Sequence, residues 1–251
     1  MSESANQQSN KLKREIEGAF RLLCEQVGRQ GVIGFVPIED VRLLPVQSAY
    51  LRRKLDGLGP WSNITAISIG LFYHEPEILA IPAGWVSRPP EDGQWNRYAR
   101  AYTELNRRLN EIATLLAERF DGVAEQATME GWVGQVSHVN DYFPACVSHR
   151  AFAEAAGVGW RGKHGLVVTL EAGPALRFAT VFISQPLSPD DKYLPGCGHC
   201  NACLEICPIL RPEEGYRERC RRRLEALGLE DEVCGICVRA CWEAVKDSAH
   251  G

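Results

Sequence analysis

The chain has 251 residues, of which 45% are hydrophobic and 24% are charged, and these ordinary globular values exclude a mostly disordered protein. Its length allows one large domain, or one medium domain with a smaller one. The formal net charge of −4 gives no general attraction for nucleic acid or for an anionic membrane surface. The most apolar stretches are too short to span a bilayer, and the polar N-terminus does not resemble a signal peptide.

Helices and strands are expected to mix along the first three quarters of the chain, after a frayed tail at 1–9. Apolar residues at helical spacing predict helices at 11–30, 46–58, 97–120 and 148–156. Short apolar runs predict strands at 31–38, 64–73, 165–170 and 177–184, with a further extended segment at 78–88. Residues 188–196 are expected to form a linker, and the segment after them is rich in cysteine and predicted to be mostly helical. The sequence therefore predicts an α/β domain at 1–187 and a small second domain at 188–251.

Cysteine usage is the abnormal feature of the composition. There are ten cysteines, and eight of them lie between Cys197 and Cys241. Disulfide-stabilised domains are short and secreted, and they spread their cysteines through the chain. The pattern instead indicates a reducing, cytoplasmic setting in which clustered thiolates bind metal.

The spacing of these eight cysteines is typical of iron–sulfur proteins. Cys197, Cys200, Cys203 and Cys207, the last followed by Pro208, reproduce the bacterial ferredoxin run for a 4Fe–4S cluster, whose fourth cysteine serves the other cluster in two-cluster proteins. A second set consists of Cys220, Cys234, Cys237 and Cys241. By this logic one cluster takes Cys197, Cys200, Cys203 and Cys241, and the other takes Cys207, Cys220, Cys234 and Cys237.

The identity of the metal and the roles of three further residues stay open. Two structural zinc sites are the alternative to clusters, because Cys-x2-Cys pairs also suit tetrahedral zinc. His199, inside the first cysteine run, is expected to be an exposed loop residue rather than a ligand. Cys24 is expected to be a buried apolar side chain, and Cys146 has no assigned role.

A glycine-rich stretch, which we call the glycine loop, runs from Gly157 to His164. It matches the dinucleotide fingerprint and nearly matches a P-loop, but a helix is predicted before it and a strand after it, the reverse of the order that phosphate binding needs. Its backbone freedom and donor side chains suit close approach of a large anionic or amide-bearing cofactor. The alternative is a tight turn with solvated charges. The candidate cofactor-binding residues are Gly157, Gly159, Trp160, Arg161, Gly162, Lys163 and His164.

A polar stretch ahead of the glycine loop contains the best acid–base candidates. His138 and His149 flank Asp141, and all three are candidate catalytic residues, with structural histidines as the alternative. The basic run 217–223 is expected to be a solvated helix face; docking of an acidic electron donor or of RNA phosphates is the other interpretation.

These motifs together resemble the epoxyqueuosine reductase family, with the reductive dehalogenases as more distant relatives. The resemblance is carried by AGVGWRGK (156–163), by the strand after it, and by CGHCNACLEICP (197–208) with its four trailing cysteines. ITAISIGLFYH (64–74) and RYARAY (97–102) also resemble segments of this family. The chain looks like the shorter, double-cluster branch of the family.

The resemblance implies an α+β fold, with a nitroreductase-like mixed α/β domain followed by a ferredoxin-like domain that binds two 4Fe–4S clusters. The first domain would bind cobalamin, which the clusters would feed with electrons for the reductive removal of an epoxide oxygen or a halide. Asp141, in its Asp-x-x-Pro context, can be laid over the catalytic aspartate of the family.

The expected partners come from the same resemblance. They are an electron donor such as ferredoxin or flavodoxin, and a substrate that is a small molecule, a nucleoside or a corrinoid protein, with no membrane. Family members usually continue into a helical segment that helps to bind tRNA, whereas this sequence stops at Gly251, so tRNA is expected to be a doubtful partner. The alternative functions are a ferredoxin-type electron carrier and a reductive activator of a corrinoid protein.

Overall fold

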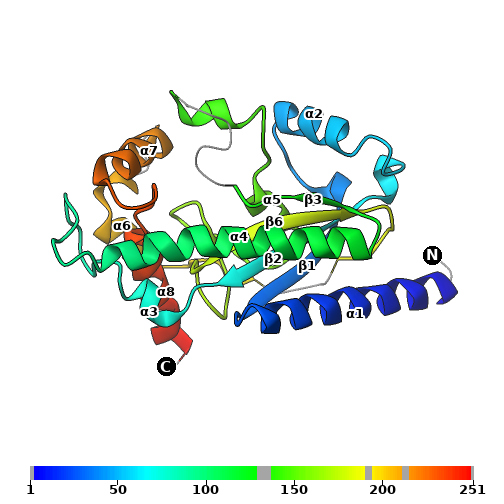
Figure 1. Ribbon diagram of the computed structural model, residues 1–251, viewed down its shortest axis with the longest axis horizontal. Coiled ribbons are helices and arrows are strands. Elements are labelled where there is room, and N and C mark those ends of the chain that lie inside the picture. The colour runs from blue at the N-terminus through cyan, green and yellow to red at the C-terminus, as the bar shows by residue number, and fades with distance from the viewer. Residues whose placement is uncertain (1–2, 129–136, 190–193, 211–214, 250–251) are drawn as a thin grey trace.

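The structure, a computed structural model, describes residues 3–128, 137–189, 194–210 and 215–249 (Figure 1). Its centre is a four-stranded antiparallel sheet in the order β1-β2-β6-β3. The strands of this sheet are β1 (Gly31–Pro37), β2 (Thr65–Phe72), β3 (Val123–Glu125) and β6 (Leu176–Ile183). A separate two-stranded ladder joins β4 (Trp160–Arg161) to β5 (Val167–Val168).

Alternate residues of each central strand point to opposite faces of the sheet. Both faces are buried, because the residues on each face pack into a hydrophobic cluster. In β2, Ile67 and Ile69 pack into one hydrophobic cluster, and Ala66 packs into the other. The same alternation in β6 places Val181 in the first cluster and Phe182 in the second. The result is a three-layer arrangement with helices on both sides of an apolar sheet.

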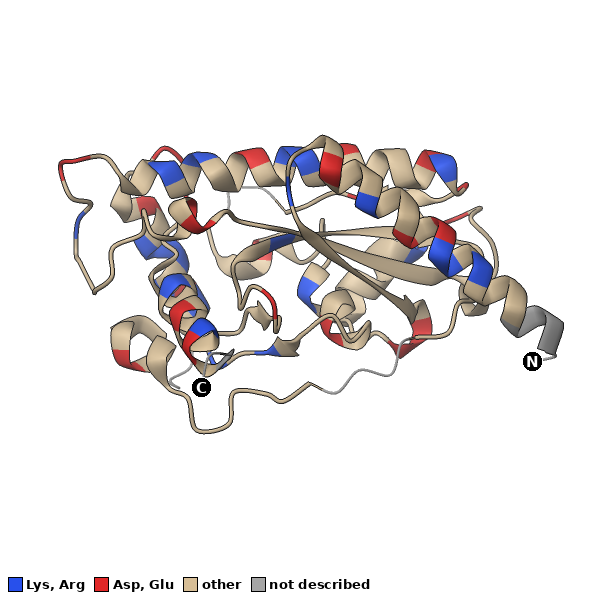
Figure 2. Cartoon of the chain, turned by 90° about the horizontal axis from the view of Figure 1, so that it is seen from below, with Lys and Arg blue, Asp and Glu red and all other residues tan. Residues whose placement is uncertain are grey.

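Two long helices, α1 (Glu3–Gln26) and α4 (Trp95–Arg119), cover the first face, and α2 (Pro45–Lys54) and α5 (His149–Ala155) belong to the second (Figure 1). In α4 the buried side chains recur at helical spacing, as predicted, so one stripe faces the core. Its exposed side has Glu104 paired with Arg107 and Arg108, and Figure 2 shows acidic and basic residues interleaved along this helix.

The cysteine-rich segment forms α6 (Ala202–Ile206), α7 (Tyr216–Leu227) and α8 (Ile236–Ala249), which gather near the N-terminal end of α4 (Figure 1). Short helices complete the chain: α3 (Glu75–Ile78), and the 3-10 turns η1 (Ile38–Asp40), η2 (Trp61–Asn63), η3 (Val139–Tyr142) and η4 (Pro208–Leu210). Leu227, Ile236 and Trp242 pack in the same hydrophobic cluster as Leu105 and Ile69. The core is therefore continuous across the predicted boundary at 187/188, and the division into two domains stays a prediction.

The structure differs from several sequence-based expectations, and β3 and β4 were not predicted. Residues 3–9, expected to be a frayed tail, begin α1, and Ser9 is buried. The expected extended segment at 78–88 forms no strand: residue 78 ends α3, and Pro82, Gly84 and Pro89 interrupt the residues after this helix. Prolines remove the backbone donors that a strand needs. Part of the expected linker at 188–196 lies outside the described residues.

In the part of the chain that the structure describes, no helix has both the length and the apolar character that crossing a bilayer requires.

Candidate metal centres and cofactor loop

The thiols of the first predicted cluster site influence one another electrostatically. Burial raises the pKa of the Cys241 thiol to about 12, and repulsion from Cys203, Cys197 and Cys200 adds to this shift. Burial likewise raises the pKa of Cys203, with further contributions from Cys197 and Cys200. Helices α6 and α8 pack against each other, so Cys241 on α8 lies beside the loop and helix that carry the other three.

The thiols of the second predicted site form a similar group. Burial raises the pKa of Cys220 to about 11, and Cys234 and Cys207 add to the shift. Burial raises the pKa of Cys237 well above its usual value, with contributions from Cys220, Cys234, Cys207 and, last, Cys203. Helix α6 ends at Cys207, whose backbone is extended before Pro208. Cys207 therefore lies among the charges that act on Cys220 and Cys237, and the crossed assignment of ligands stays a prediction.

Both groups fit iron–sulfur clusters by the chemistry of their donor sets. All of these thiols except the exposed Cys200 are at least half-buried. Neighbouring thiols that repel one another when ionised require a cationic partner to become thiolates together. In a 4Fe–4S cluster each of four thiolates binds a different iron, so the sulfurs need not converge on one point. Among the residues that the structure describes, no group of three or more His, Cys, Asp or Glu side chains is placed to hold a single metal ion.

The second cysteine group is held against α4 by contacts that the sequence did not reveal. Trp95 Nε1 donates to the Cys234 carbonyl oxygen at 2.7 Å. Gly235 has φ +78, and a Cβ there would lie 2.6 Å from Tyr98 Cε1, so only glycine fits. Arg223 donates to the Val86 carbonyl oxygen at 2.6 Å and lies over the Trp85 ring at 3.8 Å from its centroid, and its charge opposes the rise that burial causes in the pKa of Cys234.

The glycine loop connects α5 to the β4–β5 ladder, and the helix therefore precedes it, as predicted. Trp160 and Arg161 form β4, and Arg161 donates to Glu154 at 2.7 Å. A Cβ at Gly159 would lie 2.3 Å from the Val168 carbonyl oxygen. This close packing explains why residue 159 must be glycine, without reference to any bound ligand.

Lys163 of the glycine loop contacts the first cysteine run. Its Nζ donates to the carbonyl oxygens of Gly198 at 3.1 Å and Cys200 at 2.8 Å, and to Asn201 Oδ1 at 2.7 Å. The two predicted functional segments, one for a cofactor and one for a cluster, are therefore in direct contact. No feature of the sequence identifies this pair, because 35 to 38 residues separate the partners.

Three donors of the glycine loop are buried without a hydrogen-bond partner among the described residues: Trp160 Nε1, Arg161 Nε and His164 Nε2. His164 Nδ1 accepts from the Leu166 amide at 3.0 Å, so its Nε2 carries the proton, and burial lowers the pKa of His164 to about 4. Buried polar groups are normally paired, and three unpaired donors in one loop fit an acceptor-rich ligand such as the amide-bearing cobalamin. Two shallow hollows of about 460 Å³ lie elsewhere, and neither includes a residue of this loop.

Asp141 lies in η3, where its exposed carboxylate caps the turn. It accepts from the His138 amide at 2.8 Å and from the Ser137 amide and hydroxyl at 3.0 Å each. These hydrogen bonds hold the pKa of Asp141 below its usual value. The carboxylate is therefore ionised at neutral pH and must take up a proton before it can donate one.

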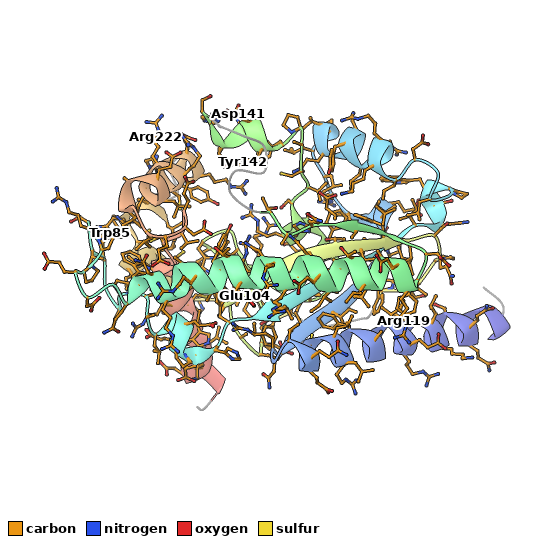
Figure 3. The ribbon with its side chains drawn as sticks, viewed as in Figure 1. Trp85, Glu104, Arg119, Asp141, Tyr142 and Arg222 are labelled. Carbon is orange, nitrogen blue, oxygen red and sulfur yellow. The ribbon has the colours of Figure 1, made fainter. Side chains whose placement is uncertain are left out.

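The loop that carries Asp141 is attached to α7. Glu218 accepts from the Val139 amide at 3.0 Å, and Arg221 donates to the Ser137 carbonyl oxygen at 3.1 Å. His138 Nε2 lies 4.0 Å from Glu218. Figure 3 shows Asp141 and Tyr142 at the same end of the molecule as Arg222 of α7. The basic run is also partly neutralised, because Glu218 pairs with both Arg221 and Arg222.

His149 is buried, and both of its ring nitrogens are engaged. Its Nε2 lies 2.8 Å from the Gln126 carbonyl oxygen and its Nδ1 lies 2.9 Å from Thr180 Oγ1. A carbonyl can only accept, so Nε2 carries the proton and the Thr180 hydroxyl donates to Nδ1. Burial lowers the pKa of His149 to about 4. This geometry favours a neutral, structural histidine over an acid–base group.

Three other residues, His199, Cys24 and Cys146, were named from the sequence, and their exposure is as follows. His199 is exposed and Cys24 is buried, as predicted. Cys146 is half-buried, and its thiol lies 3.1 Å from the Tyr142 carbonyl oxygen.

Comparison with curated proteins identifies epoxyqueuosine reductases. The protein from Shewanella oneidensis is 37% identical over 175 residues, which is 67% of this chain and 41% of that protein. The protein from Salmonella typhimurium is 35% identical over 118 residues, 47% of this chain and 30% of that protein. The chain thus spans less than half the length of these relatives. A scan against protein-family models finds no match.

The fold is also shared with a solved protein. A selenomethionine-labelled epoxyqueuosine reductase aligns with a TM-score of 0.50 at 18% identity, over 93% of this chain and 65% of that one. A further structure, of epoxyqueuosine reductase with an epoxyqueuosine-modified tRNA-Tyr stem loop, aligns with a TM-score of 0.43 at 18% identity, over 80% of this chain and 53% of that one. The partner in that complex is a tRNA stem loop, contrary to the expectation that tRNA is a doubtful partner. The chain therefore resembles the epoxyqueuosine reductases in sequence and in its mixed α/β fold.

Proposed function

We propose that the chain is an iron–sulfur reductase in which two 4Fe–4S clusters pass electrons to cobalamin. The single observation that carries the proposal is the packing of the segments that carry the eight cysteines: α6, with Cys203, packs against α8, with Cys241, and η4, directly after Cys207, packs against α7, with Cys220. One cluster would be bound by Cys197, Cys200, Cys203 and Cys241, and the other by Cys207, Cys220, Cys234 and Cys237. On this proposal the ferredoxin-like unit follows a nitroreductase-like unit, with the boundary near residue 187.

The glycine loop would hold cobalamin through its three unpaired donors, Trp160 Nε1, Arg161 Nε and His164 Nε2. When bound, cobalamin would supply a reducing cobalt centre that can attack carbon. The contact of Lys163 with the first cysteine run would keep this cofactor beside the first cluster. These donors also distinguish a reductase from a simple electron carrier, which needs no such site.

The substrate class is an epoxide, and we propose epoxyqueuosine in a tRNA stem loop, on the basis of the relatives' names and of the solved complex. Removing an epoxide oxygen as water requires two electrons and two protons. Asp141, reprotonated between turnovers, would supply a proton to that oxygen.

The test is cobalamin titration of the anaerobically reconstituted protein, followed by visible absorption. Binding should change the cobalamin spectrum, and Trp160→Phe, which removes one donor, should weaken binding by about three- to tenfold, the value of one hydrogen bond. Trp85→Phe, a substitution at a tryptophan outside the loop, is the control and should bind like the wild type. An unchanged cobalamin spectrum with the wild-type protein would refute the cofactor assignment.

The substrate is tested separately by incubating the loaded protein and a low-potential reductant with a tRNA stem loop that carries epoxyqueuosine. Mass spectrometry should show a product lighter by one oxygen atom. A product from the free nucleoside but none from the stem loop would exclude tRNA as the carrier of the substrate.

A further inference from the structure

Lys163 of the glycine loop makes its hydrogen bonds to the cysteine-rich segment instead of to the loop's own surroundings. Its ammonium group donates to Gly198, Cys200 and Asn201, so all three of its hydrogens are directed at one turn of the first cysteine run. That turn contains Cys197 and Cys200, two ligands of the proposed first cluster. A side chain that makes three hydrogen bonds to one loop fixes the loop's shape.

The same contacts place a positive charge beside the proposed first cluster. Reduction adds an electron to a cluster, so a nearby cation stabilises the reduced form and raises the reduction potential. Lys163 also polarises the peptide groups whose carbonyl oxygens it binds, which strengthens their amides as donors. The second cysteine group has a different cation nearby, Arg223, which donates to the Val86 carbonyl oxygen at 2.6 Å and whose charge favours the ionised form of Cys234.

We infer that Lys163 is a positioning residue for the first cluster: it fixes the Cys197–Cys203 turn against the glycine loop and raises the potential of that cluster alone. The inference rests on the proposed function only in requiring that the cysteines hold clusters. It needs neither cobalamin nor a particular substrate. The glycine loop would therefore act on both the cofactor and the cluster that reduces it.

The test is a redox titration of the reconstituted protein without cobalamin, followed by electron paramagnetic resonance, for Lys163→Met, Lys163→Gln and Lys163→Arg. Methionine removes the charge and the donors, glutamine keeps donors without charge, and arginine keeps the charge. Because Lys163 is exposed, its charge is screened by solvent. We expect the methionine and glutamine variants to lower the equilibrium constant for reduction of the first cluster by about three- to tenfold, which is about 30–60 mV for one electron.

The second cluster is the internal control, and its potential should not move in any variant. Lys246→Met, which removes an exposed charge from α8, is the external control and should leave both potentials unchanged. Cys241→Ala identifies the signal of the first cluster. If methionine prevents assembly of the first cluster, the glutamine variant alone decides the outcome.

Three results would overturn the inference: an unchanged first potential in the glutamine variant, an equal shift of both clusters, or an arginine variant shifted as far as the glutamine variant. If the wild-type protein contains no iron and sulfide at all, the proposed function fails instead. The two failures are therefore distinguishable.

Discussion

At the scale of single residues, the candidate catalytic groups differ sharply in what surrounds them. Asp141 is exposed and ionised, His138 accepts a hydrogen bond from the Asn140 amide, and His149 is buried with both nitrogens engaged. Only Asp141 combines exposure with a carboxyl group that can deliver a proton. Asp141 is therefore the candidate on which the proposed proton transfer rests, and the surroundings of His149 favour a structural role.

Asp141→Asn should lower the rate of epoxide reduction by about 10²- to 10⁴-fold, the usual contribution of a general acid. Asparagine can still accept the hydrogen bonds that cap η3, so cluster content should not change. The measurements are turnover of the modified stem loop and iron per chain. Asp121→Asn is the matched control, because Asp121 lies at φ 49, a conformation that asparagine also tolerates. A rate within tenfold of the wild type would remove Asp141 from the mechanism.

At the scale of elements, α7 connects the candidate acid to the second cysteine group. One face of the helix carries Cys220, and Glu218 on the same helix holds the amide of Val139. Hydrogen bonds from Arg221 hold the pKa of Glu218 well below its usual value. The lowered pKa means that these contacts stabilise the ionised carboxylate of Glu218. The attachment of the loop to α7 is therefore present at neutral pH and is lost as the pH falls through the lowered pKa.

Glu218→Gln should release the Asp141 loop from α7, because the neutral amide loses its charged pairs with Arg221 and Arg222. Hydrogen exchange followed by mass spectrometry should show faster exchange in the peptide that covers 137–146. Glu225→Gln is the control, because Glu225 pairs with the same Arg221 but does not contact the loop. Equal exchange in the two variants would show that Glu218 does not hold the loop.

The spacing of apolar residues predicted most of the helices and strands. It did not predict elements that are too short or too polar to show a repeat. The helix over 97–120 was evident because its apolar residues repeat along a strong amphipathic pattern, whereas β3 and β4 are three and two residues long. The polar residues 3–9 gave no reason to extend α1 to Glu3. The cysteine spacing predicts two crossed ligand sets, and these sets stay a prediction. Contacts such as Lys163 with Cys200 depend on tertiary packing and had no counterpart in the sequence.

At the scale of the whole molecule, the cluster segment and the α/β sheet share one hydrophobic core. Ile236 and Trp242 of α8 lie in the same cluster as Leu105 of α4, and Gly235 packs on Tyr98. Folding of the first domain should therefore help to position the second cysteine group, in contrast to two domains that are joined only by a linker.

Gly235→Ala tests this shared core. A Cβ at Gly235 would collide with Tyr98, whereas a Cβ at Gly228 would meet nothing within 4 Å, although both glycines have positive φ. Gly228→Ala is thus the matched control for backbone strain alone, which costs about 1–2 kcal/mol. Overpacking should cost Gly235→Ala about 1–3 kcal/mol more, measured as apparent unfolding free energy, with loss of the second cluster. Equal destabilisation by the two variants would contradict a tight interface.

The central claim is that eight cysteines hold two clusters whose ligand sets cross. The most direct measurement is iron and acid-labile sulfide per chain after anaerobic purification, with electron paramagnetic resonance of the reduced protein, for the wild type, Cys241→Ala, Cys207→Ala and the control Cys146→Ser. The wild type and Cys146→Ser should contain two four-iron clusters, and each alanine variant should lose about half of the iron, from different clusters. Stoichiometric zinc without sulfide, or loss of the same cluster in both alanine variants, would contradict the claim.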